Sequence, residues 1–338
     1  MRAATRRVVR AEATMKAIQC VEWGLPERLV LAEVPLPEPR AGEVRVRVEA
    51  AGVNFPDALI VQKKYQVQPP LPFTPGTEVA GVVDAVGPDV AQRKPGDRVV
   101  AFVGLGGFAE YVCVPAAQTV PLPPGVASDA AAAFTLTYAT SHHALFACGR
   151  LKAGETLAVL GAGGGVGLAA IELGRIAGAR VIALASSEEK LAAARAHGAD
   201  VAIDYTQGEL RESLKAATEG RGADVIYDPV GGAYTEAAVR SLAWRGRLLV
   251  VGFADGAIPQ IPANLLLIKE AAAIGVFWGE FARREPQANL AMLKELYGWL
   301  AEGRLKPHVS QRYALADTPR ALEALLKRKA VGKLIVNP

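Results

Sequence analysis

The sequence is poor in the residues that form disulfides and bind zinc. It has three cysteines, Cys20, Cys113 and Cys148, and four histidines among 338 residues. The cysteines are odd in number and widely spaced, and no Cys-x-x-Cys pair occurs, which argues against a disulfide framework and a four-thiolate zinc site. His142 and His143 are adjacent, so on a helix they point in different directions and make poor joint ligands. We therefore expect a protein without a metal, in the reducing cytoplasm.

Long apolar runs and blocks of one charge are also missing. No uncharged apolar stretch approaches the roughly 20 residues that a membrane helix needs. The longest candidate, residues 157–185, contains Glu172, Arg175 and Arg180. The net charge is +4, and most of it lies in residues 1–14, so the remainder is close to neutral. These absences predict no membrane insertion and no nucleic-acid binding.

Residues 1–14 form a short leader with four arginines and one glutamate. An Arg-rich, acid-poor start is similar to an organellar transit peptide. The leader has no apolar core of the length that a secretory signal needs. We interpret it as a disordered extension and expect the fold to begin near Met15.

The chain from residue 15 to 139 has the pattern of a β-rich domain. Glu43–Glu49 alternates strictly between charged and apolar residues, which predicts a strand with one buried face. Residues 78–86, 98–103 and 109–114 read as further strands. Pro95-Gly-Asp97 predicts a turn between two of them.

From residue 140 to 277, apolar strands alternate with amphipathic helices. Expected strands are 156–161, 180–184, 201–203, 224–228, 246–253 and 272–276, and expected helices are 166–177, 188–197 and 209–217. Repeated strand–helix–strand units of this length predict an α/β fold with a doubly wound parallel Rossmann sheet. In residues 278–338 we expect a helix at 288–301, a helix with Thr318 as its N-cap and Pro319 as its first residue, and a strand at 333–336. This tail is expected to return to the first domain, which is then discontinuous.

A glycine-rich turn lies between the first strand of the α/β segment and its first helix. The turn reads Ala162-Gly-Gly-Gly-Val-Gly167, with alanine where a dinucleotide-binding motif usually has its first glycine. Gly164 allows the backbone to approach a pyrophosphate, and Gly167 allows the helix to pack closely on the sheet. The free N–H groups of the helix N-terminus favour phosphate binding. The turn and its context therefore predict a dinucleotide site.

The end of the second strand indicates which dinucleotide binds. An NAD site usually has Asp or Glu there, about 20 residues after the glycine turn. This chain has two serines at that place, Ser186 and Ser187, followed by Lys190. Hydroxyl groups and an ammonium suit a 2′-phosphate, so we expect NADPH rather than NADH. Alternatively, Ser186 and Glu189 form a capping box and Lys190 is a solvated surface charge.

Several segments together resemble the medium-chain dehydrogenase/reductase superfamily and, within it, the quinone oxidoreductase (zeta-crystallin-like) family. The resemblance covers Met15 to Pro338 and is carried by Ala50–Asp57, Pro75–Gly81, Lys94–Val99, the glycine turn and Tyr227–Gly231. It implies a GroES-like catalytic domain (15–139 and 278–338), an NADPH-binding Rossmann domain (140–277), and a homodimer formed through the Rossmann sheets.

The resemblance also implies where the reaction takes place. Asn54 and Asp57 are expected to face the nicotinamide, and Tyr65 falls at the substrate cleft, where it either donates a proton or only packs. The zinc-dependent relatives have Cys and His about where Asn54 and Thr77 stand, so the resemblance implies a member without zinc. Such a member reduces conjugated carbonyl compounds, which accept hydride at carbon without a Lewis acid.

The remaining residues are assigned to the cofactor by the same resemblance. Those expected at the glycine turn, the nicotinamide, the 2′-phosphate and the strand-end loops are Thr137, Gly164, Gly165, Val166, Gly167, Ser186, Lys190, Tyr205, Val230, Gly252, Phe253, Phe277, Trp278, Gly279 and Arg328.

The sequence does not determine which compound accepts the hydride. One hypothesis is a quinone, and a second is an activated C=C bond in an enoyl thioester, enal or enone. Lys63 and Lys64 either attract an anionic thioester or lie on a solvated loop. A third hypothesis of another class is an NADPH-binding protein with a structural or sensing role and little turnover, against which the presence of Asn54, Asp57 and Tyr65 argues.

Overall fold

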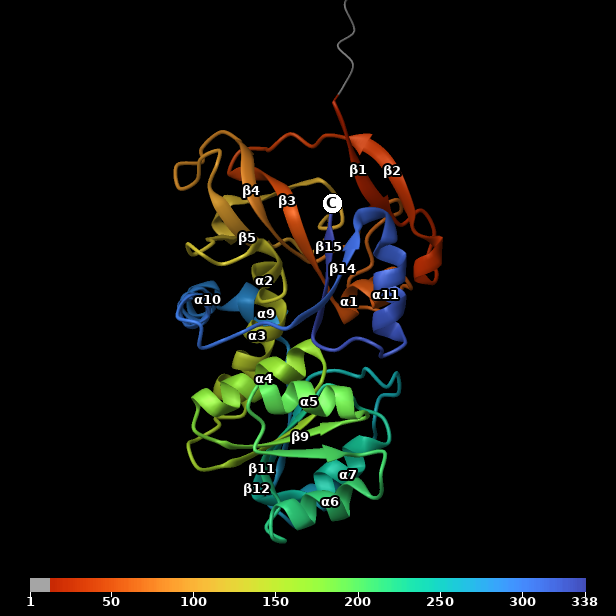
Figure 1. Cartoon of the computed structure of the whole chain (residues 1–338), viewed down its shortest axis with the longest axis vertical. Helices are drawn as coiled ribbons and strands as arrows, with labels where there is room; N and C mark the ends of the chain where they lie inside the picture. The colour runs from red at the N-terminus through yellow and green to blue at the C-terminus, as the bar shows by residue number, and fades with distance from the viewer. Residues whose placement is uncertain (1–12) are drawn as a thin grey trace, which may run out of the picture.

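The computed structural model describes residues 13–338, and the expectations for residues 1–12 lie outside this range. Figure 1 shows two parts stacked along the long axis of the molecule, a β-rich part above and an α/β part below. Each part has its own sheet.

The α/β part is built on a six-stranded parallel sheet. Its strands, in spatial order, are β10 (Val201–Asp204), β9 (Arg180–Ala185), β8 (Thr156–Leu160), β11 (Ala223–Asp228), β12 (Leu242–Val250) and β13 (Ala272–Gly275). Its helices are α4 (Gly165–Ile176), α5 (Glu188–Ala196), α6 (Leu210–Ala217), α7 (Tyr234–Arg240) and α8 (Ala263–Leu267). The strand order runs outward in both directions from β8, which is the doubly wound Rossmann arrangement expected from the sequence.

Both faces of this sheet are covered. Leu157 and Val159 of β8 belong to one apolar cluster and Ala158 and Leu160 to another, and all four are fully buried. Alternate residues of a strand point to opposite faces. The continuous apolar run of β8 thus reflects burial on both sides of the sheet.

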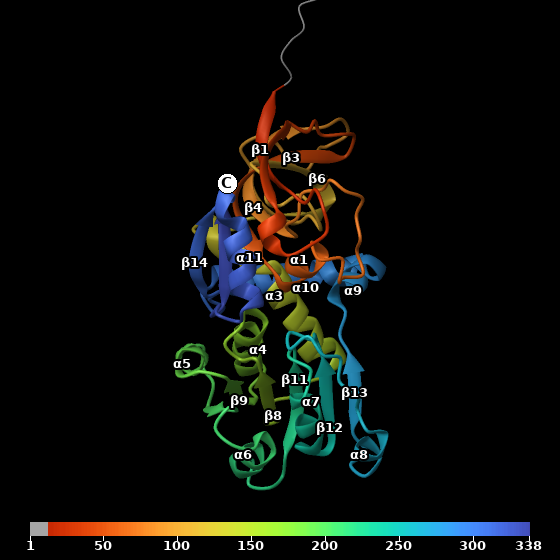
Figure 2. The ribbon, with the colours of Figure 1, turned by 90° about the vertical axis from the view of Figure 1, so that its right-hand side faces the viewer.

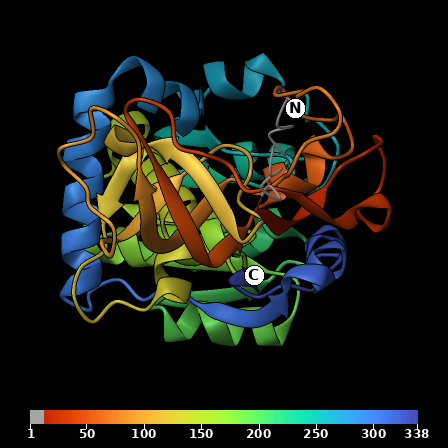
Figure 3. The same cartoon turned by 90° about the horizontal axis from the view of Figure 1, so that it is seen from above.

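The β-rich part holds a seven-stranded sheet and a hairpin. The sheet contains β14 (Val309–Ala314), β15 (Lys333–Asn337), β3 (Glu43–Val53), β4 (Glu78–Val86), β5 (Arg98–Phe102) and β7 (Thr119–Pro121) in that order, with β6 (Tyr111–Pro115) paired to β3. The hairpin is β1 (Thr14–Gln19) with β2 (Val30–Pro35). The C-terminal strand lies beside the N-terminal strands, as Figure 3 shows from above. The C-terminal tail therefore joins the seven-stranded sheet. The domain limits at residues 139 and 278 stay a prediction.

Helices fill the region between the two sheets and flank the β-rich part. They are α1 (Phe55–Ile60), α2 (Ser128–Ala132), α3 (Thr135–His142), a π-helical turn η3 (His143–Cys148), α9 (Trp278–Arg284), α10 (Pro286–Ala301) and α11 (Thr318–Leu326), with short 3-10 turns at Pro26–Arg28, Ala116–Gln118 and Leu315–Asp317. The Thr135 and Tyr297 hydroxyls lie 2.6 Å apart and join α3 to α10. This contact holds α10 against α3, which belongs to the connection between the two sheets.

Two details differ from the sequence-based expectations. Strand β12 begins at Leu242 and ends at Val250, whereas a strand was expected at 246–253. Helix α11 begins at Thr318 with Asp317 as its N-cap, and the Thr318 hydroxyl donates to the Leu315 carbonyl at 2.7 Å. Within residues 13–338, no helix is long and apolar enough to cross a membrane.

Candidate functional site: a cavity between the two sheets

A cavity of about 310 Å³ lies where the carboxyl ends of the Rossmann strands face the β-rich part. We call it the interdomain cavity. It is lined by Val53, Asn54, Phe55, Pro56, Leu136, Thr137, Gly161, Gly163, Gly164, Gly165, Val166, Ala185, Ser186, Lys190, Tyr205, Pro229, Val230, Tyr234, Val251, Gly252, Phe253, Ala254, Leu325, Arg328, Ala330, Gly332 and Lys333. Ligands of doubly wound folds bind outside the carboxyl ends of the strands at the switch in strand order. Here that switch lies between β8 and β11.

The glycine turn lines one side of this cavity. A Cβ atom added at Gly164 would have no neighbour closer than the Gly161 carbonyl oxygen at 3.4 Å, so the space above Gly164 is open. A Cβ at Gly167 would lie 2.4 Å from the same oxygen, because α4 packs directly on the turn. Gly164 thus leaves room for a ligand, whereas Gly167 leaves room for the protein itself.

Lys190 reaches into one end of the cavity. Its ammonium donates to the Arg328 carbonyl at 2.9 Å and to the Ser186 hydroxyl at 3.4 Å. Burial lowers the pKa of Lys190, and the nearby charge of Arg328 lowers it further. A bound anion would raise the pKa of Lys190 again, because its negative charge would compensate the positive charges of Lys190 and Arg328. This end of the cavity is therefore suited to a phosphate.

The helix cap beside Lys190 differs from the capping box considered as an alternative. Ser187 is the N-cap of α5, and its hydroxyl accepts from the Lys190 backbone N–H at 3.5 Å. Ser186 precedes the cap and lines the cavity. Capping by Ser187 leaves the Ser186 side chain on the cavity side.

Two tyrosines and an ion pair enclose the same end. Tyr205 and Tyr234 pack with ring centroids 4.7 Å apart. Burial raises the pKa of Tyr205. Arg328 of the segment after α11 pairs with Asp255 at 2.7 Å, which links the β-rich part to the loop after β12. Tyr234 had no signal in the sequence, because it follows β11 in a helix that the sequence pattern did not predict.

The opposite end of the cavity contains a buried polar network around Asn54. The Asn54 amide nitrogen donates to Glu78 Oε1 at 2.9 Å and lies 3.1 Å from Thr77 Oγ1. Its amide oxygen accepts from Lys333 Nζ at 2.6 Å. Asp57 is fully buried beside this network, and its Oδ2 accepts from the Asn54 backbone N–H at 2.8 Å. Burial raises the pKa of Asp57 to about 7.

The structure separates the residues that were expected at the site into two groups. Those that line the interdomain cavity are Asn54, Thr137, Gly164, Gly165, Val166, Ser186, Lys190, Tyr205, Val230, Gly252, Phe253 and Arg328. Those that do not line it are Asp57, Tyr65, Gly167, Phe277, Trp278 and Gly279. Tyr65 is half-buried against the core of the β-rich part, and burial together with the charge of Asp57 raises its pKa.

Trp278 and Gly279 line a different hollow, of about 650 Å³, between β5 and the helices α9 and α10. Trp278 is buried, contacts Phe102 edge-on at 5.1 Å, and donates to Asn289 Oδ1 at 2.9 Å. Its neighbour Phe277 is 54% exposed. These contacts place the Trp278 side chain in the packing between β5 and α10.

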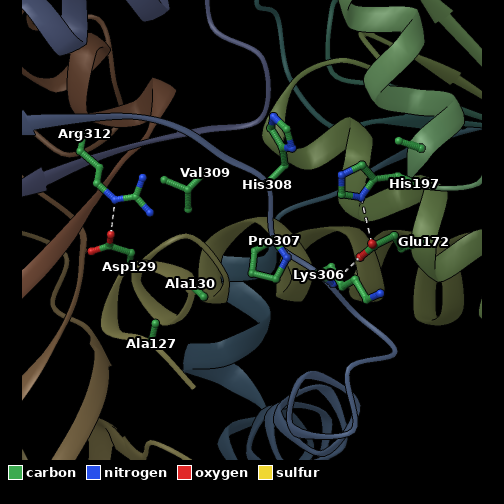
Figure 4. Close-up of a pocket in the computed structure, with 11 residues that line it drawn as sticks. Ala127, Asp129, Ala130, Glu172, His197, Lys306, Pro307, His308, Val309 and Arg312 are labelled. Atoms are coloured by element: carbon green, nitrogen blue, oxygen red, sulfur yellow. Dashed lines mark hydrogen bonds and ion pairs between the residues drawn. The ribbon is translucent and has the colours of Figure 1, made fainter. Parts of the chain in front are cut away.

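A third hollow, of about 450 Å³, lies beside the junction of the two parts (Figure 4). Glu172 of α4 accepts from the Tyr138 hydroxyl at 2.7 Å, from His197 Nδ1 at 2.9 Å and from the Lys306 backbone N–H at 3.0 Å. All of these donors belong to the protein. Glu172 therefore ties α3, α4, the end of α5 and the segment before β14 together.

The comparisons with known proteins agree with this arrangement. Residues 40–124 match the family described as alcohol dehydrogenase GroES-like domain, and residues 165–295 match the family described as zinc-binding dehydrogenase. A quinone oxidoreductase-like protein 2 homolog of Nematostella vectensis is 37% identical over 327 residues, which cover 95% of this chain and 88% of that protein. The chain belongs to the quinone oxidoreductase-like family of the medium-chain dehydrogenase/reductase superfamily.

Other relatives support the same assignment. A quinone oxidoreductase of Pseudomonas aeruginosa is 35% identical over 327 residues, covering 96% of this chain and 99% of that protein. The structure of Escherichia coli quinone oxidoreductase complexed with NADPH superimposes with a TM-score of 0.89 at 31% identity, covering 96% of this chain and all of that one. Members of this family are oxidoreductases, which confirms the expected fold and enzyme class.

The zinc named in one family description does not fit the residues of this chain. At the buried end of the cavity, Asn54 and Thr77 offer an amide and a hydroxyl, which are poor zinc ligands. The Lys333 ammonium lies 2.6 Å from the Asn54 amide oxygen, where a second cation would be repelled. In the described range 13–338, no three His, Cys, Asp or Glu residues are grouped so that they could hold a metal.

Proposed function

We propose that this protein is an NADPH-dependent, zinc-independent reductase whose acceptor is a quinone. The observation that carries the proposal is that one cavity joins the open glycine turn, a cationic end at Lys190 and a buried polar end at Asn54. When bound, NADPH supplies the hydride for the reduction. The chain's own residues bind, orient and shield the two reactants.

The fit of NADPH rests on the two ends of the cavity. The open space above Gly164 and the N–H groups at the start of α4 suit the pyrophosphate. Ser186, Lys190 and Arg328 suit the 2′-phosphate, with Tyr205 beside them. Within the described part of the chain, no carboxylate side chain lines the cavity end at Lys190, whereas an NADH site usually has one there to bind the ribose hydroxyls.

A quinone is favoured over a thioester by the character of the cavity. Apolar and small side chains dominate its lining, including Val53, Phe55 and Leu136. The two lysines that were considered for an anionic thioester have other contacts. The Lys63 ammonium lies 5.8 Å from the centre of the Trp23 ring, and Lys64 donates to Gln62 at 2.9 Å. Because Lys63 and Lys64 have these other contacts, the apolar part of the lining favours a flat, uncharged acceptor.

Tyr65 remains our candidate for supplying the proton, either directly or through a bound water. Burial and the nearby charge of Asp57 raise the pKa of Tyr65, so its hydroxyl keeps the proton that this role needs. Asn54, the N-cap of α1, lines the buried polar end of the cavity, and Asp57 accepts the Asn54 backbone N–H from within the same helix.

We also propose that the protein is a homodimer in the cytoplasm. Strand β13 is at the edge of the Rossmann sheet, where Figure 2 shows it beside α8. Near it, Leu267 is 78% exposed and Ile268 is 62% exposed. An uncharged edge strand with apolar neighbours is a template for pairing with a second copy. The cytoplasmic location rests on the three unpaired cysteines.

The proposed function is tested by following NADPH oxidation against benzoquinones, naphthoquinones, an enal, an enone and a short enoyl thioester. We expect quinones to turn over fastest, with NADPH preferred to NADH and no effect of a chelator. Fastest turnover of an enone or thioester would change the acceptor class. Tight NADPH binding without turnover of any acceptor would instead indicate a structural or sensing role.

A further inference from the structure

Lys333 is a buried charge at the end of the interdomain cavity that contains Asn54. Its side chain is 5% exposed, and its ammonium lies 2.7 Å from Glu78 Oε1, which is fully buried. Lysine is rarely buried to this extent unless it is paired, because removing a charge from water is costly. The Glu78 pair accounts for the charge, but it does not account for the position of the ammonium beside the cavity.

The polar groups around Lys333 already form hydrogen bonds within the protein. The Asn54 amide oxygen accepts from Lys333, and its amide nitrogen donates to Glu78. The second carboxylate oxygen of Glu78 accepts from the Leu136 backbone N–H at 2.9 Å. The Thr137 hydroxyl donates to the Ala133 carbonyl within its own helix at 2.9 Å. Asn54, Glu78 and Thr137 therefore have no free donor for a substrate.

The Lys333 ammonium retains one free N–H donor. An ammonium has three N–H donors, and two of them are used by Asn54 and Glu78. Lys333 lines the interdomain cavity, and its alkyl chain packs over Gly165 of the glycine turn, where an added Cβ would lie 3.0 Å from Lys333 Cδ. The Asn54 and Glu78 contacts fix the ammonium in place, so the remaining donor is already oriented before a ligand arrives.

We propose that Lys333 is a catalytic residue that stabilises the negative oxygen formed when the acceptor is reduced. This inference rests on the proposed reductase function. A C–H bond of the reduced nicotinamide breaks, the hydride forms a new C–H bond at an acceptor carbon conjugated to the carbonyl, and the π-electron pair moves to the carbonyl oxygen. With a quinone, loss of one proton from that carbon to water, once the oxygen is protonated, gives the hydroquinone. The free N–H of Lys333 hydrogen-bonds that oxygen, and Tyr65 or water then supplies the proton. The fixed ammonium thus does at this site what a Lewis acid does in a metal enzyme.

The first test replaces Lys333 by methionine, which keeps the length of the side chain and removes the charge. Removing one preorganised donor to a developing oxyanion lowers kcat by about 100-fold or more, and we expect that loss with little change in the KM for NADPH. Because Lys333→Met leaves Glu78 unpaired, the double variant Lys333→Met with Glu78→Gln removes both charges and is expected to show the same loss while folded. Lys269→Met is the matched control, since Lys269 bonds the Arg240 carbonyl far from the cavity.

The second test does not depend on turnover. para-Nitrophenol changes its absorbance on ionisation, so its pKa can be titrated while it is bound to the protein without nucleotide. We expect wild type and Lys269→Met to lower the pKa of the bound phenol and both Lys333 variants to abolish the shift. The proposal is overturned by wild-type kcat in the Lys333 variants, by a loss confined to the KM for NADPH, or by a phenol pKa that wild type does not lower. If wild type reduces no acceptor, the proposed function fails, and the phenol titration still decides the role of Lys333.

Discussion

At the scale of single residues, we expect Lys190 to set the preference for NADPH over NADH. Its ammonium bonds Ser186 and the Arg328 carbonyl at the phosphate end of the interdomain cavity. A charge-assisted hydrogen bond contributes about 1.5–3 kcal/mol, so Lys190→Ala is expected to raise the KM for NADPH by about 10- to 100-fold. The KM for NADH should change little, because NADH has no 2′-phosphate.

Steady-state kinetics with both cofactors measure this difference. Lys215→Ala is the matched control, since Lys215 is an exposed lysine of the same sheet's helix α6. Equal effects of Lys190→Ala on NADPH and NADH would remove Lys190 from the 2′-phosphate site.

The pH dependence of stability depends on Asp57. Burial raises the pKa of this carboxyl from 3.8 to about 7 in the folded protein. Between these values the folded state keeps a proton that the unfolded state loses, so this group's contribution to stability falls as pH rises from about 4 to about 7. Asp57→Asn cannot ionise, and its melting temperature should exceed that of wild type by an amount that grows across this window to on the order of a few degrees above pH 7.

Thermal melts of both proteins from pH 4.5 to pH 8.5 measure the difference. Other titrating groups cancel in the comparison because both proteins share them. A difference in melting temperature that stays constant with pH would show that Asp57 is ionised in the folded protein throughout.

Single residues also show what the sequence could and could not predict. The glycine turn, Ser186 and Lys190 were predicted because their spacing from a strand is local information. Lys333 was missed because a lysine at the start of an apolar strand has no pattern that marks it as buried. Its burial follows from Glu78, which lies 255 residues away in the sequence.

At the scale of elements, the junction of β8 and α4 uses its glycines for different purposes. Gly164→Ala should leave the melting temperature within about 2 °C of wild type, because an added methyl has space. The same methyl would fill the pyrophosphate position and weaken NADPH binding by about 10-fold or more. Gly167→Ala should instead lower the stability by about 1–3 kcal/mol, because its methyl would clash with the backbone of the turn.

Melting without nucleotide and titration of NADPH fluorescence separate these two effects. The pair serves as its own control, because both variants add one methyl within the same turn. Strong destabilisation by Gly164→Ala together with a tolerated Gly167→Ala would contradict the assignment.

Some helices and strands could be predicted from the sequence and others could not, for physical reasons. β8 and α4 were predicted because β8 is a continuous apolar run followed by a clear turn. Helix α3 was not predicted, since Thr135, Thr137 and Ser141 interrupt its apolar pattern. These polar residues are buried because they bond within the fold, as Ser141 does with the Tyr227 hydroxyl at 2.9 Å. Such tertiary partners leave no trace in local periodicity.

At the scale of the whole molecule, the doubly wound sheet could be predicted, but the way the C-terminal tail joins the structure could only be outlined. A strand at 333–336 was expected to return to the first domain. The structure pairs β15 with β3 on one side and β14 on the other. Gly332, just before β15, donates its N–H to the Gly163 carbonyl at 2.7 Å. The tail thus contacts the glycine turn directly, a link between residues 169 positions apart that no local pattern encodes.

The edge of the Rossmann sheet at β13 is where we expect two chains to assemble. If the exposed edge at β13 pairs with a second copy, charges placed beside it should separate the copies, because burying unpaired carboxylates in an interface is unfavourable. Leu267 and Ile268 are exposed apolar residues a few positions before that edge strand in the chain. Light scattering after gel filtration should give wild type twice the mass of one chain and the variant Leu267→Glu with Ile268→Glu the mass of one. Leu25→Glu, at an exposed leucine of the β-rich part, should remain a dimer. A monomeric wild type, or a double variant that keeps the dimer mass, would mean that this edge does not hold the copies together.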